Sequence, residues 1–191
     1  MCDALSDSNT VYMAKARNAT LRRERGKEEE AEGSVIVVAA RMDALAMFDQ
    51  VEVGFDSPST GLVTLLAAAR QVAEALRDHQ LGEGVENILF LLLHGESFDY
   101  MGSSRLVYDM ARDAFPYNIS QAEEEDRFLA NGTQPRLTLA KVRFWLELGQ
   151  LAPTGGSEVF LHSSGDTGGV TRALQAHRGG LKVGSLDNLD T

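Results

Sequence analysis

Residues 34–40 read SVIVVAA, a short run of β-branched and small residues without a charge. Such a run is typical of a strand that is buried on both faces of a parallel sheet. Residues 87–93, NILFLLL, show the same pattern. These two stretches predict the central strands of the fold.

The segment between the two strands has the spacing of an amphipathic helix. Its apolar residues recur every three or four positions, and Ser57, Pro58 or Ser59 can begin the helix. A strand, a helix and a strand in this order predict a crossover unit with parallel strands and the helix on one face of the sheet. The positions expected to face the sheet are Leu62, Leu65, Leu66, Ala69, Val72, Ala73 and Leu76.

The remaining segments are expected to complete the same fold. Further strands are predicted at residues 141–148 and 158–162, and a second helix at residues 103–112 with Leu106, Val107 and Met110 facing inward. The length of 191 residues allows little more than one domain. We therefore expect residues 1–191 to form one α/β domain, with a mixed, mainly parallel sheet sandwiched by helices in three α/β/α layers.

Three segments lack the periodicity of a helix or a strand. Residues 22–32 are a charged run, and residues 116–136 carry two sequons, an acidic run, Gly132 and Pro135. Both are expected to be surface loops. Residues 163–191 are expected to be a glycine-rich tail with a short helix near residues 170–177.

Composition excludes some classes of function. Apolar residues make up 43% of the chain and charged residues 24%, as in an ordinary globular protein. The net charge of 18 − 28 = −10, without a basic stripe, argues against a nucleic-acid partner. The longest apolar run, Ile88 to Leu93, is far shorter than the roughly 20 residues that span a bilayer. No signal peptide is recognisable, so a secreted or membrane-anchored protein would make this chain a fragment.

The cysteine and the sequons bear on the cellular compartment. Cys2 is the one cysteine, which fits a reduced cytosolic thiol as well as other settings. Three N-x-S/T sequons, at Asn18, Asn118 and Asn131, favour a lumenal or extracellular setting and are candidate glycosylation sites.

Polar residues gather where the two predicted central strands end. Arg41 and Asp43 follow the first strand, residues 95–104 (GESFDYMGSS) follow the second, and residues 54–61 (GFDSPSTG) open the helix between them. Open α/β sheets place their sites at the carboxyl ends of parallel strands. The three loops are therefore expected to converge on one edge.

These loops resemble those of the co-catalytic zinc aminopeptidase and transferrin-receptor clan, which read H-x-D, G-A-D-D-N-A-S-G and E-E-x-G-x-x-G-S. The resemblance implies that Glu96 stands at the general base and that Asp43 and Glu147 keep carboxylate positions of the metal site. It also implies that Arg41, Ser57 and Ser97 replace metal ligands. A guanidinium has no lone pair to donate, so we expect neither a metal nor a cofactor. We further expect Arg41 to pair with Glu96, Asp43 or Glu147.

Three ordered motifs are more specific. Residues 2–7 (CDALSD), 96–110 (ESFDYMGSSRLVYDM) and 147–150 (ELGQ) resemble signatures of the nicastrin family. Membership would imply a non-catalytic subunit of the γ-secretase intramembrane protease complex that recruits and screens type I membrane protein stubs. The implied partners are presenilin and the other γ-secretase subunits.

The same resemblance assigns roles and a location. The substrate-recognition residues would be Glu96, Asp99, Tyr100, Gly102 and Ser103. Cys2 would form a disulfide with a residue outside the chain. The chain would be part of the lumenal or extracellular ectodomain of a single-pass membrane protein of the endoplasmic reticulum, Golgi and plasma membrane.

Other readings stay open from the residues alone. The role of Asp99 and Tyr100 could be limited to capping the helix that follows them. Gly102 and Ser103 likewise suit a tight turn between strand and helix. An active zinc aminopeptidase with shifted ligands is the main alternative function. A structural module whose edge binds nothing is a third.

Overall fold

The computed structural model describes residues 8–14, 34–45, 54, 56–78, 86–115, 137–151, 159–163, 169, 172–173, 176 and 181–185. These residues belong to two compact units, residues 1–150 and 151–191. That residues 1–191 form one domain stays a prediction. The loops expected at residues 22–32 and 116–136 lie outside the described residues, as do Cys2, Asn18, Asn118 and Asn131.

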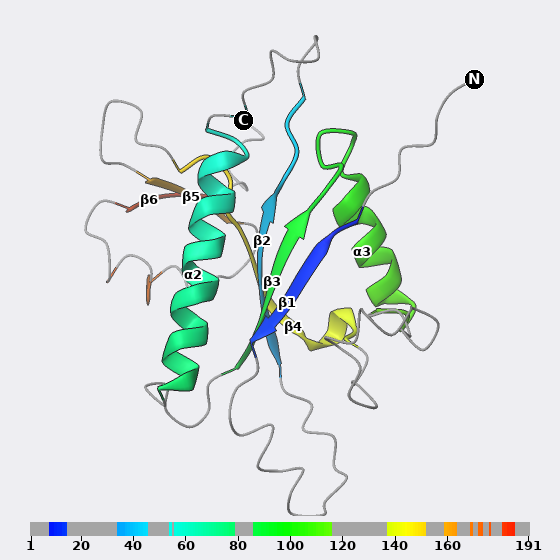
Figure 1. Ribbon diagram of the computed structural model, residues 1–191, viewed down its shortest axis with the longest axis horizontal. Helices are drawn as coiled ribbons and strands as arrows, with labels where there is room; N and C mark the ends of the chain where they lie inside the picture. The colour runs from blue at the N-terminus through cyan, green and yellow to red at the C-terminus, as the bar shows by residue number, and fades with distance from the viewer. Residues whose placement is uncertain are drawn as a thin grey trace, which may run out of the picture. The chain divides into compact units, whose positions relative to one another are not determined.

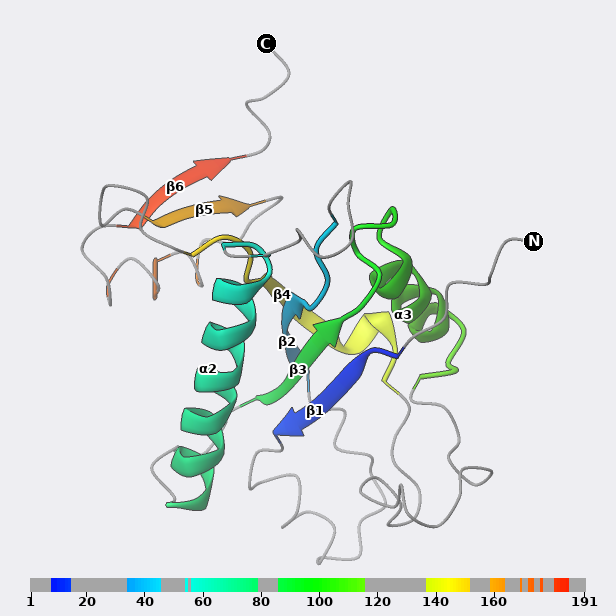
Figure 2. The same ribbon diagram turned by 45° about the horizontal axis from the view of Figure 1, so that its top comes forward.

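The first unit is built on a four-stranded sheet of order β1-β3-β2-β4 (Figure 1). Strands β2 (Val35–Arg41) and β3 (Asn87–Leu93) pair in parallel in register, with Val37 opposite Leu89. This pairing confirms the two strands and the crossover predicted from the sequence. Strand β4 (Val142–Glu147) joins β2 in parallel, and β1 (Thr10–Ala14) joins β3 antiparallel, as the opposed arrows of Figure 2 show.

Two helices cover opposite faces of this sheet (Figure 1). Helix α2 (Ser59–Arg77) packs Leu65 on the face that holds Ala40 and Phe90, and α3 (Met101–Ala111) packs on the other face. Alternate residues of β2 and β3 therefore serve two cores, so these strands have polar residues only at their ends, Arg41 and Asn87. The α3 core contains Val35, Val37, Ala39, Leu89, Leu91, Leu93, Leu106 and Met110. The expected mixed, mainly parallel sheet sandwiched by helices is confirmed.

Some details of the helices differ from the expectation. Helix α3 begins at Met101 rather than Ser103, because the chain enters it directly from a tight turn. Leu66 and Val107 were expected to face the sheet but are exposed. Each lies one residue after a buried leucine, so the helical rotation of about 100° per residue carries it away from the core.

The second unit contains a pair of parallel strands, β5 (Val159–Ser163) and β6 (Leu181–Ser185) (Figure 2). Strand β5 matches the strand predicted at residues 158–162. Strand β6 was not predicted, because Gly184 and its small, polar neighbours obscure the apolar pattern. The short helix expected near residues 170–177 falls largely outside the described residues. No helix in the described ranges is both long and apolar enough to cross a membrane.

Helix α2 approaches the end of β4 most closely at Gly61. A Cβ atom at Gly61 would lie 2.2 Å from the carbonyl oxygen of Leu148 and 2.8 Å from that of Gly149. Thr60 also donates its hydroxyl to the Gly149 carbonyl at 3.4 Å. The backbone of α2 therefore touches the backbone that follows β4, which only a glycine at position 61 permits.

Gly61→Ala is expected to lower the free energy of unfolding by about 1–3 kcal/mol, because the added methyl group displaces backbone rather than a flexible side chain. Urea denaturation followed by circular dichroism measures this change. Gly149→Ala is the matched control, since nothing lies within 4 Å of its would-be Cβ atom. The control is expected to change stability by less than about 0.5 kcal/mol. Equal losses in the two variants would contradict the close approach.

Candidate functional site at the carboxyl edge of the sheet

The expected convergence of loops is present at the carboxyl ends of the parallel strands. Arg41 closes β2 opposite Leu93, the last residue of β3, and Ala39 pairs with Glu147 at the end of β4. The Leu148 amide then donates to the Ala39 carbonyl at 2.8 Å, which continues the pairing past the strand. Parallel register thus brings the segments after β2, β3 and β4 to one edge.

Asp43 joins the loop after β2 to the loop after β3. Its Oδ1 atom accepts the backbone N–H of Glu96 at 3.0 Å, and its Oδ2 atom accepts that of Ser97 at 2.8 Å. Burial raises the pKa of Asp43, but the hydrogen bonds from Ser97 and Glu96 together outweigh burial and hold its pKa below the ordinary value of 3.8. The ionised carboxylate therefore serves as a structural anchor for the loop after β3.

Arg41 binds a hydroxyl rather than a carboxylate. Its Nε atom donates to Ser57 Oγ at 2.7 Å. Within the described residues it forms no ion pair with Glu96, Asp43 or Glu147, so that expectation was wrong. The physical reason is that Asp43 and Glu96 already receive hydrogen bonds from backbone and serine donors. Arg41 instead ties the end of β2 to the turn that opens α2.

The turn between β3 and α3 has an unusual backbone. Gly95, Asp99 and Tyr100 have φ angles of 79°, 61° and 57°. Left-handed conformations are uncommon for residues with a side chain and cost of order 1 kcal/mol or more each. The amides of Phe98 and Met101 donate to the Gly95 carbonyl at 3.1 and 3.2 Å, which holds the turn together. This geometry leaves Asp99 exposed and Tyr100 64% exposed.

Glu96 binds the first turn of α3 through its side chain. Its side chain is buried, and its two carboxylate oxygens accept the backbone N–H of Ser103 at 2.7 Å and the Ser103 hydroxyl at 2.8 Å. A carboxylate at this end also faces the positive end of the helix dipole. Glu96 thus satisfies the helix terminus, whereas Tyr100 stands at the N-cap without a side-chain hydrogen bond. The idea that Asp99 or Tyr100 caps the helix through its side chain is not supported.

Gly102 allows this terminus to pack tightly. A Cβ atom there would lie 2.2 Å from the His94 carbonyl oxygen, 2.7 Å from Asn9 Oδ1 and 3.1 Å from Glu96 Oε1. The expected role of Gly102 and Ser103 in a tight turn between strand and helix agrees with these contacts.

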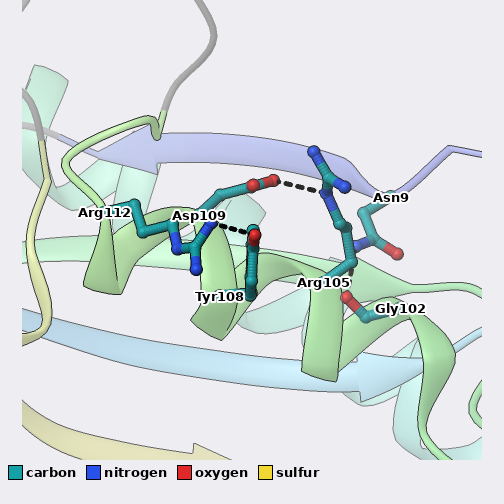
Figure 3. Close-up of polar contacts among 6 residues, drawn as sticks. All are labelled: Asn9, Gly102, Arg105, Tyr108, Asp109 and Arg112. Carbon is teal, nitrogen blue, oxygen red and sulfur yellow. Dashed lines mark hydrogen bonds and ion pairs between the residues drawn. The ribbon is translucent and has the colours of Figure 1, made fainter.

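Asn9 is a member of this site that the sequence did not reveal. Its Oδ1 atom accepts the His94 amide at 2.9 Å, and its Nδ2 atom donates to the Gly102 carbonyl at 3.0 Å (Figure 3). The side chain therefore bridges the end of β3 and the first turn of α3. A single asparagine before a strand carries no recognisable motif, since its role depends on β1 lying beside β3.

The donor set at this edge does not fit a two-zinc centre. Arg41 cannot donate a lone pair, and the hydroxyls of Ser57 and Ser97 are poor zinc ligands. Glu147 is exposed at the end of β4. Among the described residues, no group of three or more histidine, cysteine, aspartate or glutamate side chains is placed to hold a metal ion. The arrangement provides loops that are joined to one another by hydrogen bonds.

The lowered pKa of Asp43 predicts a pH-dependent loss of stability. A depressed folded-state pKa stabilises the fold above the unfolded value, and this contribution disappears as the pH falls below 3.8 through the folded pKa. Asp43→Asn should therefore flatten the decline of the free energy of unfolding below pH 3.8. It should also destabilise the protein by about 1–3 kcal/mol at neutral pH, because an amide cannot accept both N–H groups. Urea titrations at several pH values measure these changes. Asp99→Asn, in an exposed position of the same turn, is the matched control and should change the free energy of unfolding at neutral pH by less than about 0.5 kcal/mol.

Comparison with known proteins agrees with the fold and the motifs. The family model described as the nicastrin large lobe matches residues 34–187. Human nicastrin is 34% identical over 163 residues, which cover 85% of this chain and 19% of the human protein. Nicastrin of Caenorhabditis elegans is 29% identical over 133 residues, or 69% of this chain and 17% of the relative.

A solved structure shares the architecture. The crystal structure of the gamma-secretase component nicastrin superimposes with a TM-score of 0.56 at 17% identity, over 84% of this chain and 30% of that chain. The chain thus spans less than a third of the known nicastrins to which it is similar. Because the family model matches most of the chain and the fold agrees, this chain belongs to the nicastrin family.

Proposed function

We propose that this chain forms part of a non-catalytic, substrate-recruiting component of γ-secretase. It would hold the short ectodomain stubs of type I membrane proteins before their cleavage by presenilin. The solved nicastrin with the same fold is a component of gamma-secretase. A lumenal or extracellular ectodomain of a single-pass protein of the endoplasmic reticulum, Golgi and plasma membrane belongs to this proposal.

The observation that carries the proposal is the hydrogen-bonded, exposed turn between β3 and α3. Asp99 and Tyr100 project from left-handed backbone, and Tyr100 is 64% exposed. Exposed tyrosines on a fixed backbone are favourable contact residues, because little conformational entropy is lost when they bind. Glu96, Gly102 and Ser103 support the turn from inside, so the proposed recognition residues divide into two that meet a partner and three that position them.

The charge of the turn suits a particular part of the substrate. A stub left after ectodomain shedding begins with a free, positively charged amino terminus. The exposed carboxylate of Asp99 can pair with that ammonium group, and the buried carboxylate of Glu96 adds negative potential beneath it. The turn would then bind an amino terminus, as an aminopeptidase does, without cutting the peptide bond.

The degenerate metal site supports a non-catalytic role. The resemblance to the zinc aminopeptidase clan implies that these residues stand at the places of its metal ligands or of the groups that orient those ligands: Arg41, Asp43, Ser57, Ser97 and Glu147. The carboxylate of Asp43 is occupied by two backbone N–H groups, and Arg41 is bound to Ser57. An active zinc aminopeptidase would need metal donors that the described residues of this edge do not present.

Tyr100→Ala is expected to weaken capture of a stub by about tenfold, or about 1.4 kcal/mol, because it removes the most exposed aromatic contact of the turn. The measurement is photocrosslinking of a single-pass stub with a free amino terminus to γ-secretase assembled with this chain.

Glu96→Gln should lower the preference for a free over an acetylated amino terminus while leaving α3 intact, since a glutamine can still form hydrogen bonds with Ser103.

Glu74→Gln on α2 is the matched control, because it removes a carboxylate of similar size far along a different helix. It should leave stub capture unchanged. If Glu96→Gln and Tyr100→Ala both bound the stub as the unaltered protein does, while circular dichroism showed them folded, the recognition role of the turn would fail.

The non-catalytic role makes a separate prediction about metal. Purified protein dialysed against zinc is expected to retain well below one zinc ion per chain by atomic absorption, since the donor set lacks imidazoles and a bridging carboxylate. It should not hydrolyse an aminoacyl reporter. Stoichiometric zinc at two ions per chain together with hydrolysis would favour the alternative of an active aminopeptidase with shifted ligands.

A further inference from the structure

One face of α3 is exposed along the whole helix. Met101, Arg105, Tyr108 and Arg112 follow one another at intervals of three or four residues, so they line a single stripe. The opposite side of the helix, with Leu106 and Met110, is buried against the sheet. Of the stripe, Tyr108 is 46% exposed and the Arg105 side chain 62% exposed. We name these four residues the arginine–tyrosine face.

The two guanidinium groups of this face are arranged around one ring. The Arg112 guanidinium carbon lies 4.0 Å from the centroid of the Tyr108 ring, and that of Arg105 lies 5.6 Å from it. Arg112 also donates to the Tyr108 hydroxyl (Figure 3). Cation–π contacts of this kind restrict both arginine side chains before any partner arrives. The entropy that an arginine loses on binding is correspondingly smaller.

The face presents positive charge outward. Arg105 pairs with Asp109 at 3.0 Å, as Figure 3 shows, but the Asp109 side chain is only 5% exposed while the Arg105 side chain is 62% exposed. Within the described part of the chain no carboxylate pairs with Arg112. Asp113 follows in the turn beyond the helix, outside the stripe. Arg112 therefore contributes one positive charge beside the Tyr108 ring that no carboxylate of the described residues balances, on a chain whose net charge is −10.

We infer that the arginine–tyrosine face binds an acidic peptide segment of a partner protein. Carboxylates of the segment would pair with Arg105 and Arg112, and an apolar side chain would lie between Tyr108 and Met101. Tyrosine, methionine and arginine are the residues that protein interfaces favour. The 11 residues of α3 extend for about 16 Å, enough for an extended segment of about five residues.

A peptide fits this face better than an anionic membrane does. Polybasic recognition of a lipid surface generally takes a cluster of about four to eight basic residues, whereas this face has two. The net charge of the chain also opposes non-specific attraction of acidic molecules. Binding of an acidic peptide would therefore have to come from the local surface. This face contains none of the residues proposed to meet the stub, so its function is independent of the proposed recognition turn.

The test uses the full chain and a short fluorescein-labelled peptide of glutamates around a central leucine, with fluorescence anisotropy as the readout. Arg112→Gln is expected to raise the Kd about tenfold. Arg70→Gln on α2 is the matched control, because it also removes one exposed guanidinium with an i,i+4 geometry. It should change the Kd by less than about twofold. The same peptide with glutamine in place of glutamate should bind at least about tenfold more weakly.

A second variant, Arg112→Lys, tests whether the charge or the contact with the ring matters. It also serves as the test if circular dichroism shows that Arg112→Gln does not fold. A lysine keeps the charge but loses the planar contact, so a rise in Kd of about threefold is expected. Equal effects of Arg112→Gln and Arg70→Gln, equal binding of the glutamine peptide, or absence of glutamate-peptide binding would overturn the inference. So would binding to phosphatidylserine vesicles that depends on Arg112 while the peptide does not bind.

Discussion

The parallel pairing of β2 with β3 is the contact on which the rest of this structure depends. Each strand is buried on both faces, so each supplies one set of side chains to α2 and the alternate set to α3. A fully buried valine or leucine contributes roughly 1.5–3 kcal/mol, and both cores draw on the same two strands. Because the pairing is in register from Val35 to Arg41, both strands end at the same level. The loops that follow them must therefore meet.

At that edge, the charged side chains of the loops bind backbone and hydroxyl groups of the protein itself. Backbone amides bind Asp43, Ser103 binds Glu96, and Ser57 binds Arg41. These contacts fix the loop after β3 without a cofactor. The strained backbone of Asp99 and Tyr100 is held by the surrounding contacts, which include the bridge made by Asn9. These contacts together support the exposed turn between β3 and α3.

Helix α3 connects two surfaces with different chemistry. Its first turn is bound to Glu96 and Asn9 and supports the acidic turn proposed to meet an amino terminus. Its outer stripe carries stacked arginines that suit acidic peptides. Both surfaces rely on Leu106 and Met110, which anchor the helix to the sheet. A change in the α3 core would thus affect both surfaces together, whereas changes at exposed residues should affect them separately.

The sequence by itself determined the central strands, the crossover helix and the edge at which the loops converge. These features follow from local hydrophobic periodicity and from the rule that parallel strands end together, neither of which needs long-range information. It also determined the family, because the motifs are contiguous.

Only the tertiary structure decided the partners of the charged groups. Arg41 binds Ser57 rather than a carboxylate, Glu96 binds Ser103, and Asn9 reaches the site from the segment before β1, which is distant in sequence. It also decided that Val107 is exposed and that Arg105 and Arg112 flank one ring. The physical reason is that a side chain's partner depends on strand register, helix rotation and rotamer. These quantities are set when the sheet and the helices pack, and residue type alone leaves them open.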